Sequence, residues 1–203
     1  MIDMSLMKLS LEKKRKLFHL SAILVPLLYA TLPDHINTII LIAVAMVVGF
    51  CDFLRIFVQQ FNAKVEGIFD AIMRSSEKTK LSGCTYMMLG FALTGMIFPT
   101  YVCIAAWLVL IFADAFAALV GQAANPGKSG KTIVGSFAFL TTALIVSICY
   151  LEFYGYNYHF LSIIGASIVA MLVEFYNKNL RLNDNFAIPI AFAGTFKLLE
   201  MIW

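Results

Sequence analysis

Several features that mark other classes of protein are missing from this chain. Charged residues make up only 13% of its 203 residues. The Lys and Arg among them are divided over four segments instead of one basic patch, which argues against nucleic acid as a partner. The four cysteines, at positions 51, 84, 103 and 149, lie far apart and lack metal-ligand spacing, so neither a zinc site nor a disulfide framework is indicated. There is no tandem repeat. The first apolar run ends in Leu32-Pro33-Asp34 rather than a small-residue cleavage pattern, so we expect no cleaved signal peptide.

Hydrophobic residues are in excess. They make up 61% of the chain, against roughly 45–50% in soluble domains, and the mean hydropathy is +0.86. An α-helix of about 20 apolar residues crosses a bilayer. We therefore expect an all-α, polytopic integral membrane protein with about seven transmembrane helices, forming a single membrane-embedded domain over 1–203. The seven apolar stretches are Leu17–Pro33, Ile36–Phe53, Ser82–Phe98, Tyr101–Val120, Ile133–Tyr154, Phe160–Tyr176 and Phe186–Trp203.

The basic residues predict how these helices are oriented. All Lys and Arg residues except Lys197 precede the first stretch or lie in alternate connections, and positive charge stays on the cytoplasmic side of a membrane. We expect the N-terminus inside and the C-terminus outside, in the cytoplasmic (inner) membrane if the source is prokaryotic. The opposite turns carry no Lys or Arg, and the tyrosines between Tyr154 and His159 suit an outer aromatic belt. The inner basic residues are Lys8, Lys13, Lys14, Arg15, Lys16, Arg55, Lys64, Arg74, Lys78, Lys80, Lys128, Lys131, Lys178 and Arg181.

The connection from Arg55 to Lys80 has a helical pattern of its own. Its apolar residues recur at helical spacing and its charged residues take the other side, which predicts an amphipathic helix on the inner membrane surface. The alternative is a simple extension of the second helix into the cytosol. The apolar set is Phe57, Phe61, Val65, Ile68, Phe69, Ile72 and Met73, and the charged set is Lys64, Glu66, Asp70 and Arg74.

Four acidic residues at the predicted inner depth are candidate metal ligands. A charge inside a membrane is costly, so Asp114, thirteen residues into its apolar stretch, is a functional candidate by default. Asp52, Glu174 and Asp184 come from other stretches, and carboxylate oxygens are the ligands that Mg²⁺ prefers. The alternatives are that a hydroxyl of a neighbouring helix satisfies Asp114 and that the other three are solvated helix ends or ion-pair partners.

The segment from Gly121 to Ser136 is rich in glycine, lysine and hydroxyl side chains, a composition that can bind phosphate. It is not a P-loop, because five residues separate Gly121 from Gly127 where four are required, and because it follows a membrane helix rather than a strand. An ordinary positive-inside loop is the alternative.

Taken in order, several segments resemble one enzyme family. Asp114-Ala115 through Gly121, followed by Lys131-Thr132-x-x-Gly135-Ser136, looks like the CTP-dependent lipid-alcohol kinase family of dolichol kinase, phytol kinase and yeast-type diacylglycerol kinase. That family is related to phosphatidate cytidylyltransferases. The chain departs from it at Gln122 and Val134, where members often carry Arg and Glu, and Lys128 is the cation that would replace the arginine. The similarity covers nearly the whole chain and includes Arg15-Lys16 with His19, Arg74-Ser-Ser-Glu77, Gly83-Cys-Thr85-Tyr86 and Asn183-Asp184-Asn185 with Pro189.

The resemblance implies phosphorylation of the hydroxyl of a membrane lipid alcohol at the cytosolic face. CTP would be the donor, with ATP as an alternative, and Mg²⁺ or Mn²⁺ the cofactor. The implied catalytic residues are Asp114, Lys131 and Asp184, and the candidate metal ligands are Asp114, Asp184, Glu174 and Asp52. The implied nucleotide-binding residues are Arg74, Glu77, Gly83, Thr85, Gly121, Lys128, Thr132, Gly135 and Ser136.

Two other functions stay open at this point. A cytidylyltransferase would use the same nucleotide to make a CDP-lipid and release pyrophosphate. A small transporter or assembly subunit would use the intramembrane acids as an ion path, and would distribute polar residues across the depth of the bilayer. The acceptor is also open among polyprenol or dolichol, phytol and diacylglycerol, and the sequence leaves room for a homo-oligomer.

Overall fold

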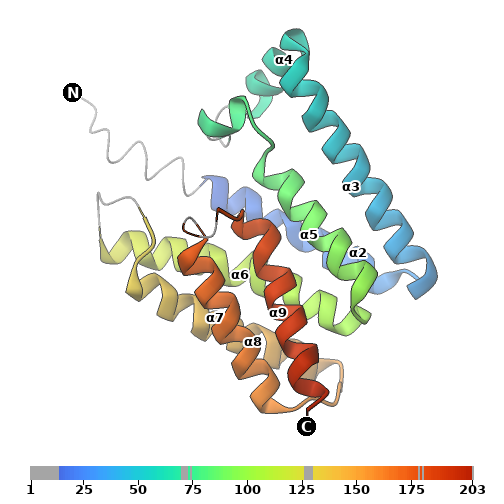
Figure 1. The fold of residues 1–203 in the computed structure, drawn as a ribbon, viewed down its shortest axis with the longest axis vertical. Coiled ribbons are helices and arrows are strands. Elements are labelled where there is room, and N and C mark those ends of the chain that lie inside the picture. The colour runs from blue at the N-terminus through green and yellow to red at the C-terminus, as the bar shows by residue number, and fades with distance from the viewer. Residues whose placement is uncertain are drawn as a thin grey trace.

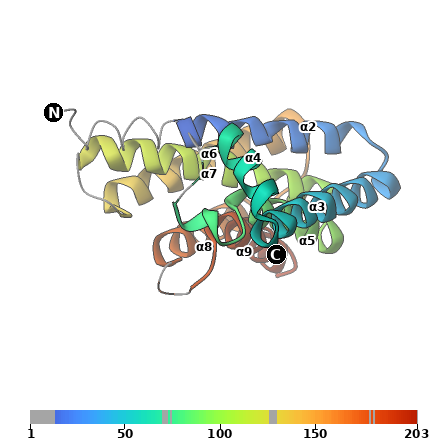
Figure 2. The ribbon, with the colours of Figure 1, turned by 90° about the horizontal axis from the view of Figure 1, so that it is seen from above.

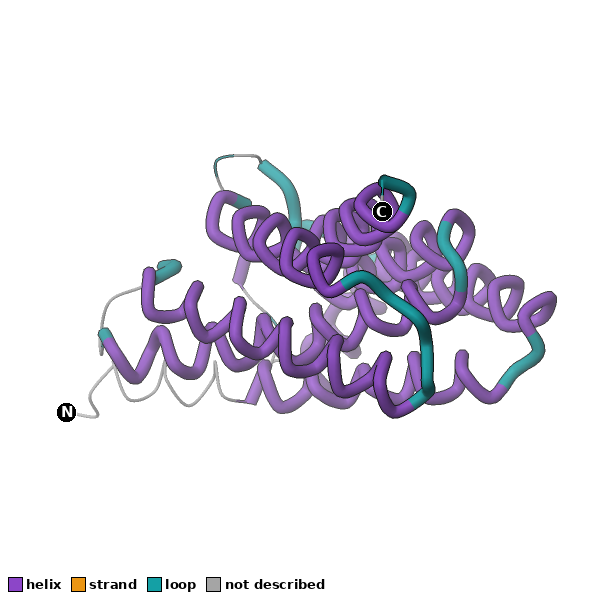
Figure 3. The backbone as a smooth tube through the Cα atoms, turned by 90° about the horizontal axis from the view of Figure 1, so that it is seen from below, coloured by secondary structure: helices purple, strands orange, loops and turns teal. Residues whose placement is uncertain are grey.

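The computed structural model describes residues 14–69, 73, 75–125, 130–177, 179 and 181–202. This part of the chain consists of helices and their connections, without a strand (Figure 3), which confirms the all-α class. Each of the seven apolar stretches is helical, and the first is divided into three consecutive helical segments. After a helix over residues 14–20 come η1 (Ser21–Ile23), α2 (Leu24–Thr31), α3 (Asp34–Phe57), α4 (Gln59–Phe69), η2 (Ser75–Lys78), α5 (Gly83–Ile97), α6 (Thr100–Ala124), α7 (Ile133–Phe153), α8 (Phe160–Tyr176) and α9 (Asp184–Glu200).

Three of the described helices are long and apolar enough to cross a membrane: Ile36–Phe57 within α3, all of α6 and all of α7. Two shorter apolar helices, α5 and α8, accompany them. Several long apolar helices are what a membrane protein requires. The count of seven spans and the orientation in the bilayer stay predictions.

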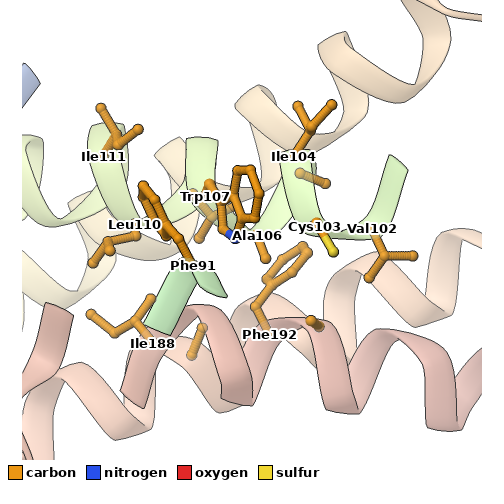
Figure 4. Packing of buried hydrophobic residues seen from close by; sticks show 14 of the residues in the cluster. Phe91, Val102, Cys103, Ile104, Ala106, Trp107, Leu110, Ile111, Ile188 and Phe192 are labelled. Carbon is orange, nitrogen blue, oxygen red and sulfur yellow. The ribbon is translucent and has the colours of Figure 1, made fainter. Parts of the chain in front are cut away.

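Helix α6 is the centre of the bundle. It packs against α7 and α9 and also contacts α2 and α5. Of the residues in its most apolar part, 72% are buried. Seen from above, α2 and α6 lie on one side of the molecule and α8 and α9 on the other (Figure 2). Buried Trp107 stacks on Phe91 of α5 with ring centroids 4.8 Å apart and donates a hydrogen bond to Thr94 Oγ1 at 2.7 Å. Figure 4 shows Trp107 and Phe91 with Phe192 of α9 between the helices. Apolar packing with a satisfied indole N–H fixes this core.

Glycines bring α6 and α7 close together. A Cβ atom on Gly135 would lie 2.8 Å from the carbonyl oxygen of Ala117, and one on Gly121 would lie 2.7 Å from Thr132 Oγ1. The small face at Ala117 and Gly121 therefore admits a neighbouring helix backbone, as small residues do between membrane helices.

The connections gather at two opposite ends. At one end, Thr100 Oγ1 of α6 donates to Asp34 Oδ1 of α3 at 2.9 Å, and Tyr101 donates to Glu200 at the end of α9. The Tyr101 ring stacks on Tyr156 of the α7–α8 turn at 5.0 Å. The turns that carry no Lys or Arg therefore share the end at which the chain finishes, opposite the described start of the chain (Figure 1).

The connection after α3 folds as a separate helix. Val58 adopts an extended conformation, with φ −110° and ψ 99°, so α3 ends and α4 begins in a new direction (Figure 1). The alternative of a simple extension of α3 is wrong, because this one residue interrupts the helix. The described amphipathic helix is also shorter than Arg55–Lys80, at 11 residues. Positions 70–72 and 74, which include Asp70, Ile72 and Arg74, lie outside the described residues.

Candidate functional site

A cavity of about 430 Å³ lies at the end of the bundle that holds the basic segments. Its size falls in the range of about 300–1,000 Å³ that is typical of small-molecule sites. The starts of α5 and α9 and the helix over residues 14–20 meet at this end, below α4 (Figure 1). The polar part of the lining is Arg15, Lys16, His19, Asp52, Arg55, Glu77, Ser82, Thr85, Asp114, Asp184 and Asn185.

Asp114 is one of the buried charged groups of this cavity. Its side chain is only 5% exposed, and the ammonium of Lys16 donates a hydrogen bond to its Oδ2. His19 Nε2 lies 3.9 Å from the same oxygen and 3.4 Å from the carbonyl oxygen of Leu110. The buried carboxylate that the sequence predicted is thus confirmed as buried. Its partner comes from the N-terminal helix, 98 positions away in the sequence.

Asp52 accepts hydrogen bonds from the start of α5. Its Oδ2 accepts from Ser82 N–H at 2.6 Å and from Thr85 Oγ1 at 2.8 Å, while its Oδ1 accepts two N–H groups of Arg55 at 2.6 and 2.8 Å. Negative charge at a helix N-terminus is favourable, and a carboxylate with this many donors is satisfied. Asp52 therefore has a structural role in this conformation, and its role as a metal ligand stays a prediction.

Arg55 holds the segment from Glu77 to Lys80 against the end of α3. Besides Asp52 it binds the carbonyl oxygens of Glu77 at 2.7 Å and Lys80 at 2.8 Å, and its side chain is 2% exposed. The sequence marked Arg55 only as a positive-inside residue. The signal that could have identified it is its position three residues after Asp52 on one helix, which places the two side chains on the same face.

Two residues of the predicted nucleotide set hold α5 to its neighbours. Gly83 N–H donates to Glu77 Oε1 at 3.2 Å, and Gly83 C=O accepts from Asn185 of α9 at 2.9 Å. A Cβ atom on Gly83 would lie 2.8 Å from Asn185 Nδ2. Glycine at this position thus permits a close contact between α5 and α9. Glu77, Gly83 and Thr85 all line the cavity, so the structure brings them to the same place as Asp114 and Asp184.

A second group of charged side chains, centred on Lys131, lies next to those that line the cavity. Lys131 donates to Glu174 of α8 and, at 3.4 Å, to Asp184 Oδ2. Asn177 Nδ2 also donates to Asp184 Oδ2 at 3.1 Å. Burial alone lowers the pKa of Lys131, but three nearby carboxylates outweigh it and raise this pKa above its usual value: Asp114, Asp184 and Glu174. Asp184 thus belongs to both groups, because it lines the cavity and binds Lys131.

The remainder of the predicted phosphate loop has structural partners. Thr132 caps α7, since its Oγ1 accepts from Gly135 N–H at 3.0 Å, and Ser136 Oγ donates to Thr132 C=O at 3.3 Å. With Gly121, these residues lie at the contact of α6 and α7 and do not line the cavity. Arg74 and Lys128 lie outside the described residues. The nucleotide contacts of this loop stay predictions.

Two acidic side chains of the cavity are candidate ligands for the predicted magnesium ion. In the part of the chain that the structure describes, no three side chains of His, Cys, Asp or Glu converge as a ready-made metal cage. Mg²⁺ does not need one, because it usually takes one or two carboxylates together with water and substrate phosphates. Asp114 and Asp184 both line the cavity and are the candidates for such a pair, and their role as magnesium ligands stays a prediction.

Comparison with known proteins identifies a relative but no characterised family. No model of a protein family matches the chain, and no solved structure matches it. The chain is 40% identical over 185 residues to the uncharacterized protein RP860 of Rickettsia prowazekii, which covers 89% of this chain and 91% of that protein. A match of this identity and extent places both chains in one family: the protein belongs to the family of Rickettsia prowazekii RP860.

Proposed function

We propose that this protein is a membrane-embedded kinase that transfers the γ-phosphate of a nucleotide, CTP by family resemblance, to the hydroxyl of a lipid alcohol. One observation carries the proposal: a single cavity contains the buried carboxylate of Asp114 and the partly buried carboxylate of Asp184, beside cationic groups and an apolar wall. Buried ionisable groups inside apolar helices mark functional sites, and a mixed lining suits a substrate with a polar end and an apolar body.

The proposal includes a topology. Seven helices cross the membrane with the N-terminus inside, so that the cavity opens at the cytosolic face where CTP is present. The basic segments support this orientation. So does the grouping of the turns without Lys or Arg at the opposite end.

The residues have distinct tasks in the transfer. The lipid hydroxyl oxygen forms a bond to the γ-phosphorus, the bond from that phosphorus to the β–γ bridging oxygen breaks, CDP leaves, and the hydroxyl proton is released. Such transfer depends on positioning and charge neutralisation. Asp114 accepts a hydrogen bond from the attacking hydroxyl and so orients it, while Lys16, with its hydrogen bond to Asp114, and Arg15 bind the phosphate oxygens. Asp114 and Asp184 would hold Mg²⁺, which when bound neutralises charge on the phosphates.

The Lys131 group positions Asp184. Asp184 Oδ2 accepts hydrogen bonds from the Lys131 ammonium and the Asn177 amide. These contacts fix the carboxylate at the start of α9, next to Asn185. Substitution of Lys131 is therefore expected to impair the site through Asp184 as well as through any direct contact with phosphate.

Product analysis tests the proposal. Purified protein in lipid nanodiscs is incubated with CTP, Mg²⁺ and one lipid alcohol at a time, from a panel of polyprenol, phytol and diacylglycerol. CDP and a lipid monophosphate are the expected products. Pyrophosphate and a CDP-lipid, formed when phosphatidic acid is the added lipid, would identify a cytidylyltransferase instead. No nucleotide turnover with any lipid would leave the transporter or assembly function as the better account.

A further inference from the structure

Helix α4 closes one side of the cavity without belonging to the core of the molecule. Three of its residues, Phe61, Val65 and Phe69, line the cavity and lie at i, i+4 and i+8, on one side of the helix. None of the 11 residues of α4 is buried, and none belongs to the hydrophobic core formed by the described helices. Because an element with few buried contacts opens at a low cost in free energy, α4 is held weakly.

The contacts at the far end of α4 are of a kind that breaks easily. The ring of Phe69 packs edge-on against the ring of Phe18 in the N-terminal helix, with centroids 6.2 Å apart. Glu66 accepts a hydrogen bond from Lys78 at 3.5 Å. These two side chains are 28% and 41% exposed, and an ion pair with this much exposure to water adds little stability. The aromatic contact is therefore the main attachment of α4 to the N-terminal helix.

A single residue joins α4 to α3. Helix α3 ends at Phe57 and α4 begins at Gln59, and Val58 between them is extended. Hinges are a few residues at the ends of elements that absorb changes of φ and ψ, and Val58 has such a position. Beside it, Asn62 accepts a hydrogen bond from Arg55 at 3.4 Å, which is longer than the usual range. A change of angle at Val58 would therefore break only a weak contact.

The side of α4 that lines the cavity also suits the surface of a membrane. Ile68 continues this apolar side and is 74% exposed, so the cavity covers only part of it. Gln60, Ala63 and Gly67 are exposed on the other side, and a Cβ atom on Gly67 would meet no described atom within 4 Å. An amphipathic helix of this kind buries its apolar side at the boundary of lipid head groups and chains. The apolar side that leaves the cavity would thus stay out of water.

From these observations we propose that α4 is a hinged lid of the cavity. It pivots at Val58 between the closed position of the structure, in which Phe69 contacts Phe18, and an open position in which its apolar side lies on the membrane surface. Closure excludes water from the cavity, which protects a bound nucleotide from hydrolysis. This purpose rests on the proposed function, whereas the movement itself requires no nucleotide.

Distances between spin labels test the movement without a catalytic readout. Nitroxide labels are attached to Lys64→Cys on α4 and Ile145→Cys on α7, which are exposed positions, after alanine has replaced the four cysteines. Double electron–electron resonance in nanodiscs measures the distance. Position 64 lies about 9 Å along the helix from Val58, so a swing of α4 is expected to give two distances. The pair of Ile145 with Leu198 on α9 is the control and should give one. A single distance for the α4 pair, unchanged in every variant, would overturn the lid.

Two adjacent residues of the N-terminal helix provide a matched pair of variants. Phe18 lines the cavity and contacts Phe69, whereas Leu17 is 71% exposed and does not line it. Phe18→Ala is expected to raise the ratio of open to closed molecules by about two- to tenfold, as for the loss of one aromatic pair. Leu17→Ala is expected to leave the ratio unchanged. Equal ratios in the two variants would overturn a lid that closes on Phe18.

A substitution at Ile68 tests the open position. Ile68 does not line the cavity and is largely exposed when the lid is closed, but the membrane surface would cover it when the lid is open. Adding Ile68→Ala to Phe18→Ala is therefore expected to lower the ratio of open to closed molecules by about fourfold or more, the equivalent of one buried methylene. An unchanged ratio would refute the membrane surface as the place where the open lid rests.

The outcomes separate the lid from the proposed function. If both distances occur and shift as expected while no lipid alcohol is phosphorylated, the kinase proposal fails and the lid stands. If a lipid alcohol is phosphorylated while the α4 pair gives one distance, the kinase proposal stands and the lid is wrong.

Discussion

Replacing Asp114 with asparagine tests whether this carboxylate is catalytic or structural. The test also requires a substitution of Lys16, because the two side chains form an ion pair. Both side chains are buried, with exposed fractions of 10% for Lys16 and 5% for Asp114. Considered by itself, Asn at this position would keep the shape of the side chain and relieve the cost of a buried charge. The structure changes this expectation, because Asp114→Asn leaves the ammonium of Lys16 buried without its carboxylate. Breaking a buried ion pair by removing one partner costs about 3–5 kcal/mol.

A double variant removes this complication. Asp114→Asn with Lys16→Met eliminates both charges at once, and replacement of a whole buried pair by uncharged groups is often neutral for stability. We expect the double variant to unfold at nearly the same temperature as the unaltered protein, and the single Asp114→Asn variant at a lower one. Thermal unfolding in detergent, followed by circular dichroism, measures both.

Activity then decides the role of Asp114. Loss of one electrostatic partner of a transition state lowers the rate by about 10²–10³, so phosphate transfer to a lipid alcohol should fall by that factor in Asp114→Asn and not recover in the stable double variant. Asp34→Asn is the matched control. Asp34 is at the start of α3, far from the cavity at the other end of this helix, and Thr100 is its hydrogen-bond partner among the described residues. Near-normal turnover by Asp114→Asn or by the double variant would refute the catalytic assignment.

Three further predictions follow from the same geometry. Cysteines introduced at Ser129 and Asn157 should react differently with an impermeant maleimide applied to closed cells, position 157 being labelled and position 129 protected; the opposite pattern would reverse the topology. Excess EDTA should abolish phosphate transfer and added Mg²⁺ or Mn²⁺ should restore it, so full activity in EDTA would remove the metal from the account. Arg55→Met should destabilise the protein by about 3–5 kcal/mol, because Asp52 would be left buried without its partner, and addition of Asp52→Asn should restore part of that stability. Denaturation in mixed micelles measures both, and an unchanged midpoint for Arg55→Met would contradict the role of Arg55 as a brace.

The positions of the helices could be predicted from the sequence because they depend on local composition. Each apolar stretch is helical with ends within a few residues of those expected, and the described helix α4 lies within the connection whose apolar residues recur at helical spacing. Burial of Asp114 was also predictable, since a carboxylate in the middle of an apolar stretch has no route to water. These inferences needed only hydropathy and helical periodicity.

The partners of the charged residues could not be predicted in the same way. The contact of Lys16 with Asp114 joins segments 98 positions apart, and that of Lys131 with Asp184 spans 53 positions. Such pairs depend on which helices become neighbours, which composition does not specify. The small face of Ala117, Ala118 and Gly121, at helical spacing after Asp114, did predict the close approach of a backbone or a ligand, and α7 makes that approach. The matching role of Gly135 was missed, because glycine beside lysine has the composition of a phosphate loop and only the approach of α7 to α6 reveals its use in close packing.

The most direct measurement follows the fate of each phosphate of CTP. CTP labelled in the γ-phosphate and, separately, in the α-phosphate is supplied to the purified protein with Mg²⁺ and the preferred lipid alcohol, and the lipid fraction is extracted. We expect label from the γ-phosphate to enter the lipid, with unlabelled lipid when the α-phosphate carries the label. Entry of the α-label into the lipid, or of neither label with any alcohol in the panel, would contradict the assignment of this protein as a lipid-alcohol kinase.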